Sequence, residues 1–173
     1  MEDNIIIVDT GGNAIGEIDK MEAHISGTLH RAFSVFVFNS KGQLLLQQRA
    51  LDKYHSGGLW TNTCCSHPRA DEFTPDAAHR RLREEMGMDC ELTELFQFGY
   101  RHEFANGLIE NEYDHVFMGI SDEFPLPNPA EVAGFRYIDT DLLIFELLEQ
   151  PEQYTAWFKI CLEKVLEIYR QII

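Results

Sequence analysis

The stretch of residues 72–88 constrains the fold most, because it holds one clearly delimited helix inside a chain of β-rich runs. Thr74 is placed to cap this helix, Pro75 suits its first position, and Gly87 suits its end. These signals predict a helix over Pro75–Met86. A helix that is flanked on both sides by strand-like sequence is expected to pack against a sheet.

Short β-rich runs separated by turn residues fill most of the remaining chain. Asn39-Ser40-Lys41-Gly42 and Asn106-Gly107 are typical of hairpin turns, and Ser56–His67 is predicted as a loop with short extended pieces. The expected strands are Ile5–Val8, Ile15–Ile18, Ala32–Phe38, Leu44–Gln48, Leu92–Phe104, Ile109–Ile120 and Gly134–Ile138.

Two further helices are expected near the C-terminus. Asp139 is placed to cap a helix over Asp141–Glu149, and apolar residues recur at helical spacing from Pro151 onward. We find no repeat, low-complexity tract or linker. The sequence therefore predicts an α/β (α+β) chain, with a mixed sheet and packed helices forming a single domain over residues 1–173.

Charge and composition limit the partners. The chain has 14 Lys and Arg against 29 Asp and Glu, a formal net charge of −15, which argues against nucleic acid or an anionic membrane as a partner. A small anionic ligand remains compatible, because a buried site sets its own local potential. The sequence lacks a membrane-length apolar run and a secretory signal pattern, so we expect a cytoplasmic protein with free thiols.

Arg81, Glu84 and Glu85 lie three or four residues apart and share one side of the predicted helix. Alone, this pattern is typical of a solvated face with salt bridges. The run EFTPDAAHRRLREEMGM nevertheless resembles the Nudix box, a loop–helix–loop over about residues 66–88 that binds divalent metal on a diphosphate. Two positions depart from that pattern: Ser66 replaces its leading Gly, and Arg81 replaces a metal-binding Glu.

The segment Trp60–Pro68, WTNTCCSHP, resembles the TNxxCxHP signature of type 1 isopentenyl-diphosphate isomerases, a branch of the Nudix superfamily. The resemblance implies an essential acid/base at Cys65 and a metal ligand at His67. In extended backbone these two side chains face the same way and Cys64 faces elsewhere. Taken alone, a Cys-x-His pair is more typical of a buried, inert thiol.

Glu110 and Glu112 share one face of a predicted strand, which costs repulsion unless they share a cation or a proton. The resemblance implies that they complete a His3Glu2 metal set with His24, His30 and His67, where the first two histidines lie in a predicted loop. Such a set favours Mn²⁺ or Zn²⁺, whereas Mg²⁺ suits the oxygen-rich diphosphate site.

The resemblance extends from about Lys20 to Trp157 and implies further roles. Glu85 corresponds to the carboxylate for the second metal, Tyr100 to a catalytic tyrosine and Trp157 to an active-site indole. The cations implied around the diphosphate are Lys20, Arg49, Lys53 and Arg81. The histidines without an implied role, which are interpreted as structural, are His55, His79, His102 and His115.

The expected function is interconversion of isopentenyl and dimethylallyl diphosphate, a step of isoprenoid biosynthesis, by a monomer or weak homodimer. One alternative is a Nudix pyrophosphatase of nucleoside diphosphate derivatives, which would leave Cys65 without a role. The other is a regulatory module that binds a ligand without turnover. We expect Cys65 and the metal-bound Glu112 to add and remove the protons, with Tyr100 as a relay. This constellation favours the isomerase over both alternatives.

Overall fold

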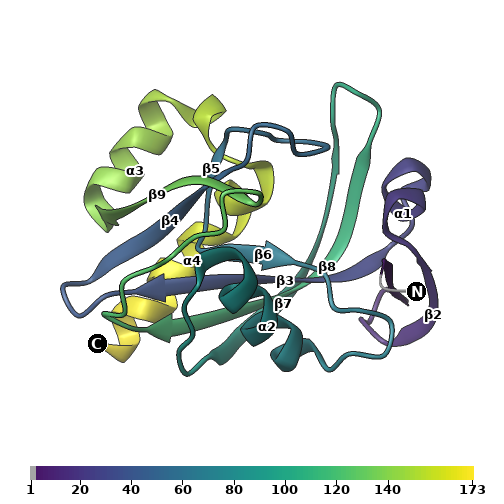
Figure 1. Ribbon diagram of the computed structural model, residues 1–173, viewed down its shortest axis with the longest axis horizontal. Helices are drawn as coiled ribbons and strands as arrows, with labels where there is room; N and C mark the ends of the chain where they lie inside the picture. Colours follow the sequence, from purple (N-terminus) through teal and green to yellow (C-terminus); the bar gives the residue numbers. More distant parts are fainter. Residues whose placement is uncertain (1–2) are drawn as a thin grey trace.

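The computed structural model describes residues 3–173, which form one mixed sheet with helices on both faces (Figure 1). The strands are β1 (Asn4–Val8), β2 (Ala14–Asp19), β3 (His30–Phe38), β4 (Gln43–Arg49), β5 (Trp60–Thr61), β6 (Cys64–Ser66), β7 (Thr93–Glu103), β8 (Ile109–Ile120) and β9 (Val132–Asp139). The helices are α1 (Lys20–Ser26), α2 (Thr74–Met86), α3 (Thr140–Glu149) and α4 (Ala156–Ile172), with a short 3₁₀ turn at Pro151–Gln153.

Strand β3 is the centre of the sheet. It pairs with β8 in parallel along its whole length, from His30 to Phe38, and with β6 antiparallel on its other side over Phe33–Val35. Strands β3 and β4 share only one pair, Phe38 with Leu44, and β4 then pairs with β9 and β5. The sheet therefore opens between β3 and β4.

The alternation of side chains along β3 divides the core into two layers. Phe36 and Phe38 face α4, together with Leu44 and Leu46 of β4, whereas Val35 and Val37 face α2. All of these side chains are fully buried. The predicted α/β fold, a mixed sheet sandwiched by helices, is confirmed.

The helix predicted over Pro75–Met86 is α2, and it ends where Gly87 adopts a left-handed backbone. A Cβ at residue 87 would lie 2.2 Å from the Leu126 carbonyl oxygen, so a side chain there would force the backbone apart. The N-terminal cap was predicted wrongly. Phe73 is the capping residue and provides no side-chain hydrogen bond, while Thr74 is already helical.

The sequence interpretation missed helix α1. It placed His24 and His30 in a loop, whereas His24 lies on this helix and His30 begins strand β3. The Asp19 side chain accepts a hydrogen bond from the Glu22 backbone N–H at 3.0 Å, and Gly27 ends the helix with φ of 72°. Both capping residues are of types that mark helix ends in a sequence. The helix has only seven residues, too few for a clear apolar period.

Candidate active site

One pocket collects nearly all of the side chains that the sequence pointed to. Its volume is about 40 Å³, and it adjoins a polar groove of about 270 Å³ that shares Lys20, Lys53 and Arg81 with it. The predicted site residues that line the pocket are Lys20, Arg49, Lys53, Cys65, His67, Arg81, Glu85, Tyr100, Glu110, Glu112 and Trp157. The other two, His24 and His30, are fully buried and meet His67 beside the pocket.

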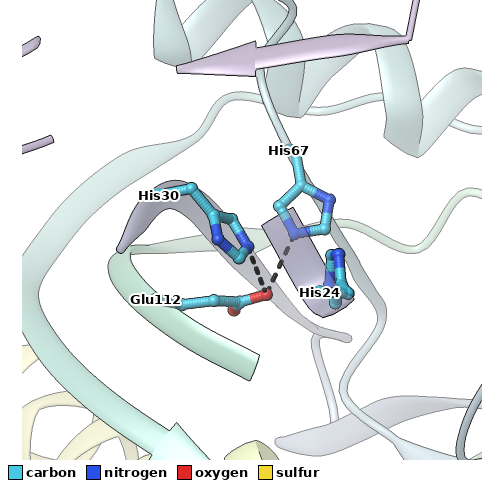
Figure 2. Close-up of side chains that lie close together, drawn as sticks. All are labelled: His24, His30, His67 and Glu112. Carbon is cyan, nitrogen blue, oxygen red and sulfur yellow. Dashed lines mark hydrogen bonds and ion pairs between the residues drawn. The ribbon is translucent and has the colours of Figure 1, made fainter. Parts of the chain in front are cut away.

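Three imidazoles surround one carboxylate oxygen of Glu112 (Figure 2). His67 Nε2 lies 2.9 Å from Glu112 Oε1, and His30 Nε2 lies 3.5 Å from the same oxygen. With His24, these residues offer four ligand atoms that all lie within 4.8 Å of one another. They come from α1, the start of β3, the segment after β6, and β8, so the sheet register assembles the cluster.

The chemistry of this donor set fits a metal ion. His24 Nδ1 lies 2.7 Å from the Lys20 carbonyl oxygen and His30 Nδ1 lies 2.8 Å from that of Thr28, so each ring donates its Nδ1–H outward. In the neutral rings their Nε2 atoms carry lone pairs, and neither atom has a well-aligned hydrogen-bond partner among residues 3–173. Buried nitrogen lone pairs close to a carboxylate are unsatisfied unless a cation lies between them, so the cluster is suited to bind one.

The ionisation states of His24, His67 and Glu112 also suit a metal ion. Burial lowers the pKa of His24 to about 4 and that of His67 to about 3, so both rings are neutral near pH 7. Burial lowers the pKa of His30 as well, but its contact with Glu112 outweighs this and raises the pKa. Burial opposes ionisation of Glu112, yet the contacts with His30 and His67 hold the pKa of that carboxyl well below its usual range.

Glu110 lies in a second group, which overlaps the first at His24. The single His3Glu2 set therefore stays a prediction. The ligand atom of Glu110 lies within 4.8 Å of those of His24 and His55. Tyr100 Oη lies 2.7 Å from both Glu110 Oε2 and Glu112 Oε2, and so joins the two groups. Burial and the neighbouring Glu112 raise the pKa of Glu110, and burial with both carboxylates raises the pKa of Tyr100.

The two adjacent cysteines have different surroundings, because successive side chains on a strand alternate. Cys64 is completely buried in the core layer under α2, whereas Cys65 lines the pocket. On β6, Cys65 lies opposite Ser34 of β3. Burial raises the pKa of both thiols, so Cys65 carries its proton near pH 7.

All four cations predicted for a diphosphate line the pocket, and three of them, Lys20, Lys53 and Arg81, also line the adjoining groove. Burial, together with the nearby Lys53 and Arg81, lowers the pKa of Lys20, which reflects a concentrated positive potential in an acidic protein. Arg81 donates to Glu85 at 2.5 Å. Glu131, which the sequence did not point to, pairs with Lys53 and lies 3.4 Å from Arg81.

The remaining pocket wall is aromatic. Trp157 comes from the buried stripe of α4 and is 3% exposed, and the Arg49 guanidinium lies 5.3 Å from the centre of its ring. Its indole face therefore borders a pocket that also contains charged groups.

In the described part of the chain, no helix combines the length and apolar character needed to cross a membrane.

Solved structures agree with the fold. A crystal structure from Deinococcus radiodurans aligns with a TM-score of 0.70 at 18% identity, covering 85% of this chain and 90% of that one. The MutT NUDIX hydrolase of Burkholderia pseudomallei aligns with a TM-score of 0.64 at 20% identity, covering 80% and 98%. At these identities the likeness concerns the fold alone.

Sequence comparison identifies the family. The NUDIX domain model matches residues 28–158. Isopentenyl-diphosphate Delta-isomerase 2 of Aromatoleum aromaticum is 53% identical, covering 96% of this chain and 88% of that relative. Isopentenyl-diphosphate Delta-isomerase of Burkholderia multivorans is 52% identical, covering 95% and 93%. The predicted resemblance is thus confirmed, and the chain belongs to the isopentenyl-diphosphate Delta-isomerase family of NUDIX-domain proteins.

Proposed function

We propose that this protein interconverts isopentenyl diphosphate and dimethylallyl diphosphate by protonation and deprotonation. The observation that carries the proposal is the placement of Cys65 and Glu112, which line one pocket from strands on opposite sides of β3. A basic patch lies in the same pocket. The relatives named above are isomerases of the same diphosphate.

Cys65 and Glu112 are suited to serve opposite faces of an alkene. Adding a proton to the terminal carbon leaves a tertiary carbocation, and removing a proton from the neighbouring allylic carbon forms the double bond in its new position. The buried thiol retains its proton and the Glu112 carboxyl is ionised. One residue can therefore give a proton while the other accepts one, and the roles exchange when the reaction runs backward.

Tyr100 lies where a proton relay is needed. Its hydroxyl is 2.7 Å from an oxygen of each glutamate, and it can donate only one proton at a time. A proton held among Glu110, Tyr100 and Glu112 would relieve the repulsion between two buried carboxylates. We assign Tyr100 the movement of that proton to and from Glu112.

The metal ions have supporting roles in this proposal. When bound, an ion at the imidazole-rich cluster would fix and polarise the Glu112 carboxylate, and one beside Glu85 would neutralise the diphosphate. Imidazole-rich donors favour Mn²⁺ or Zn²⁺, whereas carboxylate and phosphate oxygens favour Mg²⁺. Gln47 Nε2 donates to Glu85 Oε2 at 2.9 Å and keeps that carboxylate facing the pocket.

The aromatic wall protects the carbocation. A tertiary cation gains from the electron-rich face of an indole, and Trp157 presents such a ring in a buried position. Excluding water also prevents capture of the cation as an alcohol. We assign Trp157 this stabilising role, with Lys20, Arg49, Lys53 and Arg81 holding the diphosphate.

Hydrolysis is disfavoured by the helix that faces the diphosphate. Arg81 occupies the position where the Nudix pattern has a metal-binding glutamate, and it reaches Glu84 at 2.8 Å and Glu85 at 2.5 Å. A guanidinium neutralises a phosphate but supplies no metal ligand for activating water. The same substitution that weakens hydrolysis therefore helps to retain the substrate.

The proposed location, domain organisation and oligomeric state are those expected from the sequence. We propose a cytoplasmic, single-domain protein over residues 1–173 that works as a monomer or weak homodimer on a free small molecule. The net charge of −15 supports the absence of nucleic-acid and anionic-membrane partners. Sedimentation at several protein concentrations would measure the oligomeric state.

The direct test is to incubate purified protein with isopentenyl diphosphate and Mg²⁺ in D₂O and to follow the products by NMR. We expect dimethylallyl diphosphate that carries deuterium, because each turnover exchanges a proton with the protein. Phosphate release without any five-carbon isomer would instead identify a hydrolase. Binding of the diphosphate without turnover, in the presence of Mn²⁺ and Zn²⁺ as well, would identify a binding module.

A further inference from the structure

His55 lies inside the site, although its sequence context gave it no role. It belongs to the loop between β4 and β5 and is 5% exposed. Its ring stacks on Phe104 with centroids 4.2 Å apart and planes inclined by 11°. Its Nε2 atom lies 2.9 Å from Glu110 Oε1. A buried imidazole is thus held against one of the glutamates proposed for the metal centre.

The separation between His55 and Glu110 also suits two ligands of one metal ion. Although the two atoms are 2.9 Å apart, the contact of His55 Nε2 does not meet hydrogen-bond geometry in the part of the chain described. Two ligands of one ion, each about 2.1 Å from it at right angles, are about 3 Å apart. The third ligand atom of this group, His24 Nε2, is buried and equally without a partner.

The backbone of the loop that carries His55 is tightly turned. Ser56 is the only non-glycine residue with positive φ among residues 3–173, at 53°. A Cβ at Gly57 would lie 2.5 Å from the Leu51 carbonyl oxygen, so the loop closes tightly on itself. Ser56 Oγ lies 3.2 Å from His55 Nδ1, which fixes the ring with Nε2 toward Glu110. Backbone strain of this kind gathers at ligand-binding positions.

We propose that His55 is a further ligand of the transition-metal centre, acting with His24 and Glu110 beside His30, His67 and Glu112. The single lone pair of His24 Nε2 serves one ion at a time, so both groups address the same ion rather than two. The centre then has four imidazoles available instead of the three implied by the family resemblance. This inference rests on the proposed metal centre.

The test measures metal binding directly. Wild-type protein, His55→Ala and His102→Ala are stripped with a chelator, and the dissociation constants of Mn²⁺ and Zn²⁺ are measured by competition. His102 is the matched control, because its ring also contacts Phe104 but is outside both ligand groups. We expect His55→Ala to bind at least about 10-fold more weakly, and His102→Ala to bind like wild type. X-ray absorption of the zinc-loaded proteins should show one histidine fewer in His55→Ala.

A positioning role for His55 gives a different pattern. The side-chain amide of His55→Gln can hydrogen-bond Glu110 but is a poor ligand, so this variant should fold and yet show the weak affinity of His55→Ala. It also replaces His55→Ala if that variant fails to fold. Restored affinity in His55→Gln, or an unchanged histidine count in the variant that folds, would overturn the inference and leave the reaction proposal intact. A wild-type protein that binds neither ion would overturn the metal centre itself.

Discussion

His30 lies directly opposite Glu112 in the parallel ladder of β3 and β8, with its Nε2 atom 3.5 Å from Glu112 Oε1. On the other side of β3, Ser34 lies opposite Cys65. One central strand thus sets the position of two proposed metal ligands, His30 and Glu112, and of the thiol on its other flank. A shift of either partner strand by one residue would turn Glu112 or Cys65 to the opposite face of the sheet.

Cys65→Ala should reduce isomerisation by at least about 100-fold, because no neighbouring group can replace a positioned proton donor. The circular dichroism spectrum should not change. Cys64→Ala is the matched control: it removes a buried sulfur from the α2 core layer and should cost about 1 kcal/mol of stability while most activity remains. Equal loss of activity at both positions would mean that the register of the signature is wrong.

His67→Ala should weaken binding of Mn²⁺ or Zn²⁺ by at least about 100-fold without substrate, since it removes a proposed ligand of the buried cluster. Glu85→Gln should leave that binding unchanged and instead raise the Mg²⁺ concentration needed for activity. Titration calorimetry and activity at graded Mg²⁺ separate the two effects. Full metal occupancy after loss of both His30 and His67 would rule out the imidazole-rich site.

Tyr100→Phe should lower kcat by at least about 10-fold and leave the metal affinity close to that of wild type, because the hydroxyl relays a proton but binds no ion. The ring itself remains to fill the buried space. Tyr113→Phe, on the adjacent strand and outside the pocket, serves as the control. A fall in metal affinity equal to the fall in kcat would indicate that the hydroxyl only shapes the ligand set.

Glu72→Gln should destabilise the protein by about 1 kcal/mol near pH 7, a typical value for a well-aligned, partly exposed ion pair. Glu72 accepts hydrogen bonds from Arg80 at 2.6 and 2.8 Å and from the Arg69 backbone N–H at 3.0 Å. The hydrogen bonds from Arg80 lower the pKa of Glu72 in the folded state.

The sign of the pH dependence follows from that lowered pKa. The unfolded carboxyl has a pKa of about 4.3, so the stabilisation is present above that pH and is lost as the pH falls through the lower folded value. Urea unfolding near pH 7 and near pH 3 should therefore show the difference between wild type and Glu72→Gln shrinking in acid. Glu84→Gln, whose ion pairs are more exposed, should show a smaller difference.

Regular periodicity made much of the fold predictable. A local sequence repeat predicts the strands around β3, the helix α2 and the apolar stripe of α4. The period-two alternation of a strand likewise predicts that Cys64 and Cys65 face opposite sides. Helix α1 was missed because seven residues carry caps but no clear period.

Long-range geometry made the rest unpredictable. His55 reaches Glu110 from a loop in which Ser56 has a positive φ, and neither that backbone conformation nor the contact has a sequence period. For the same reason the sequence did not indicate that Glu110 and Glu112 separate into two groups joined by Tyr100. Distances between elements decide these features.

Arg81 provides the decisive comparison between isomerase and hydrolase. We expect negligible hydrolysis of nucleoside diphosphate derivatives at protein concentrations that isomerise isopentenyl diphosphate rapidly, with Mg²⁺ in both assays. Arg81→Glu should raise KM by at least about 10-fold, because it places a negative charge beside the diphosphate and frees Glu85 from its partner. It should not create an efficient hydrolase, since the pocket keeps its shape. Pyrophosphatase turnover that survives Cys65→Ala, with no five-carbon product, would overturn the proposed function.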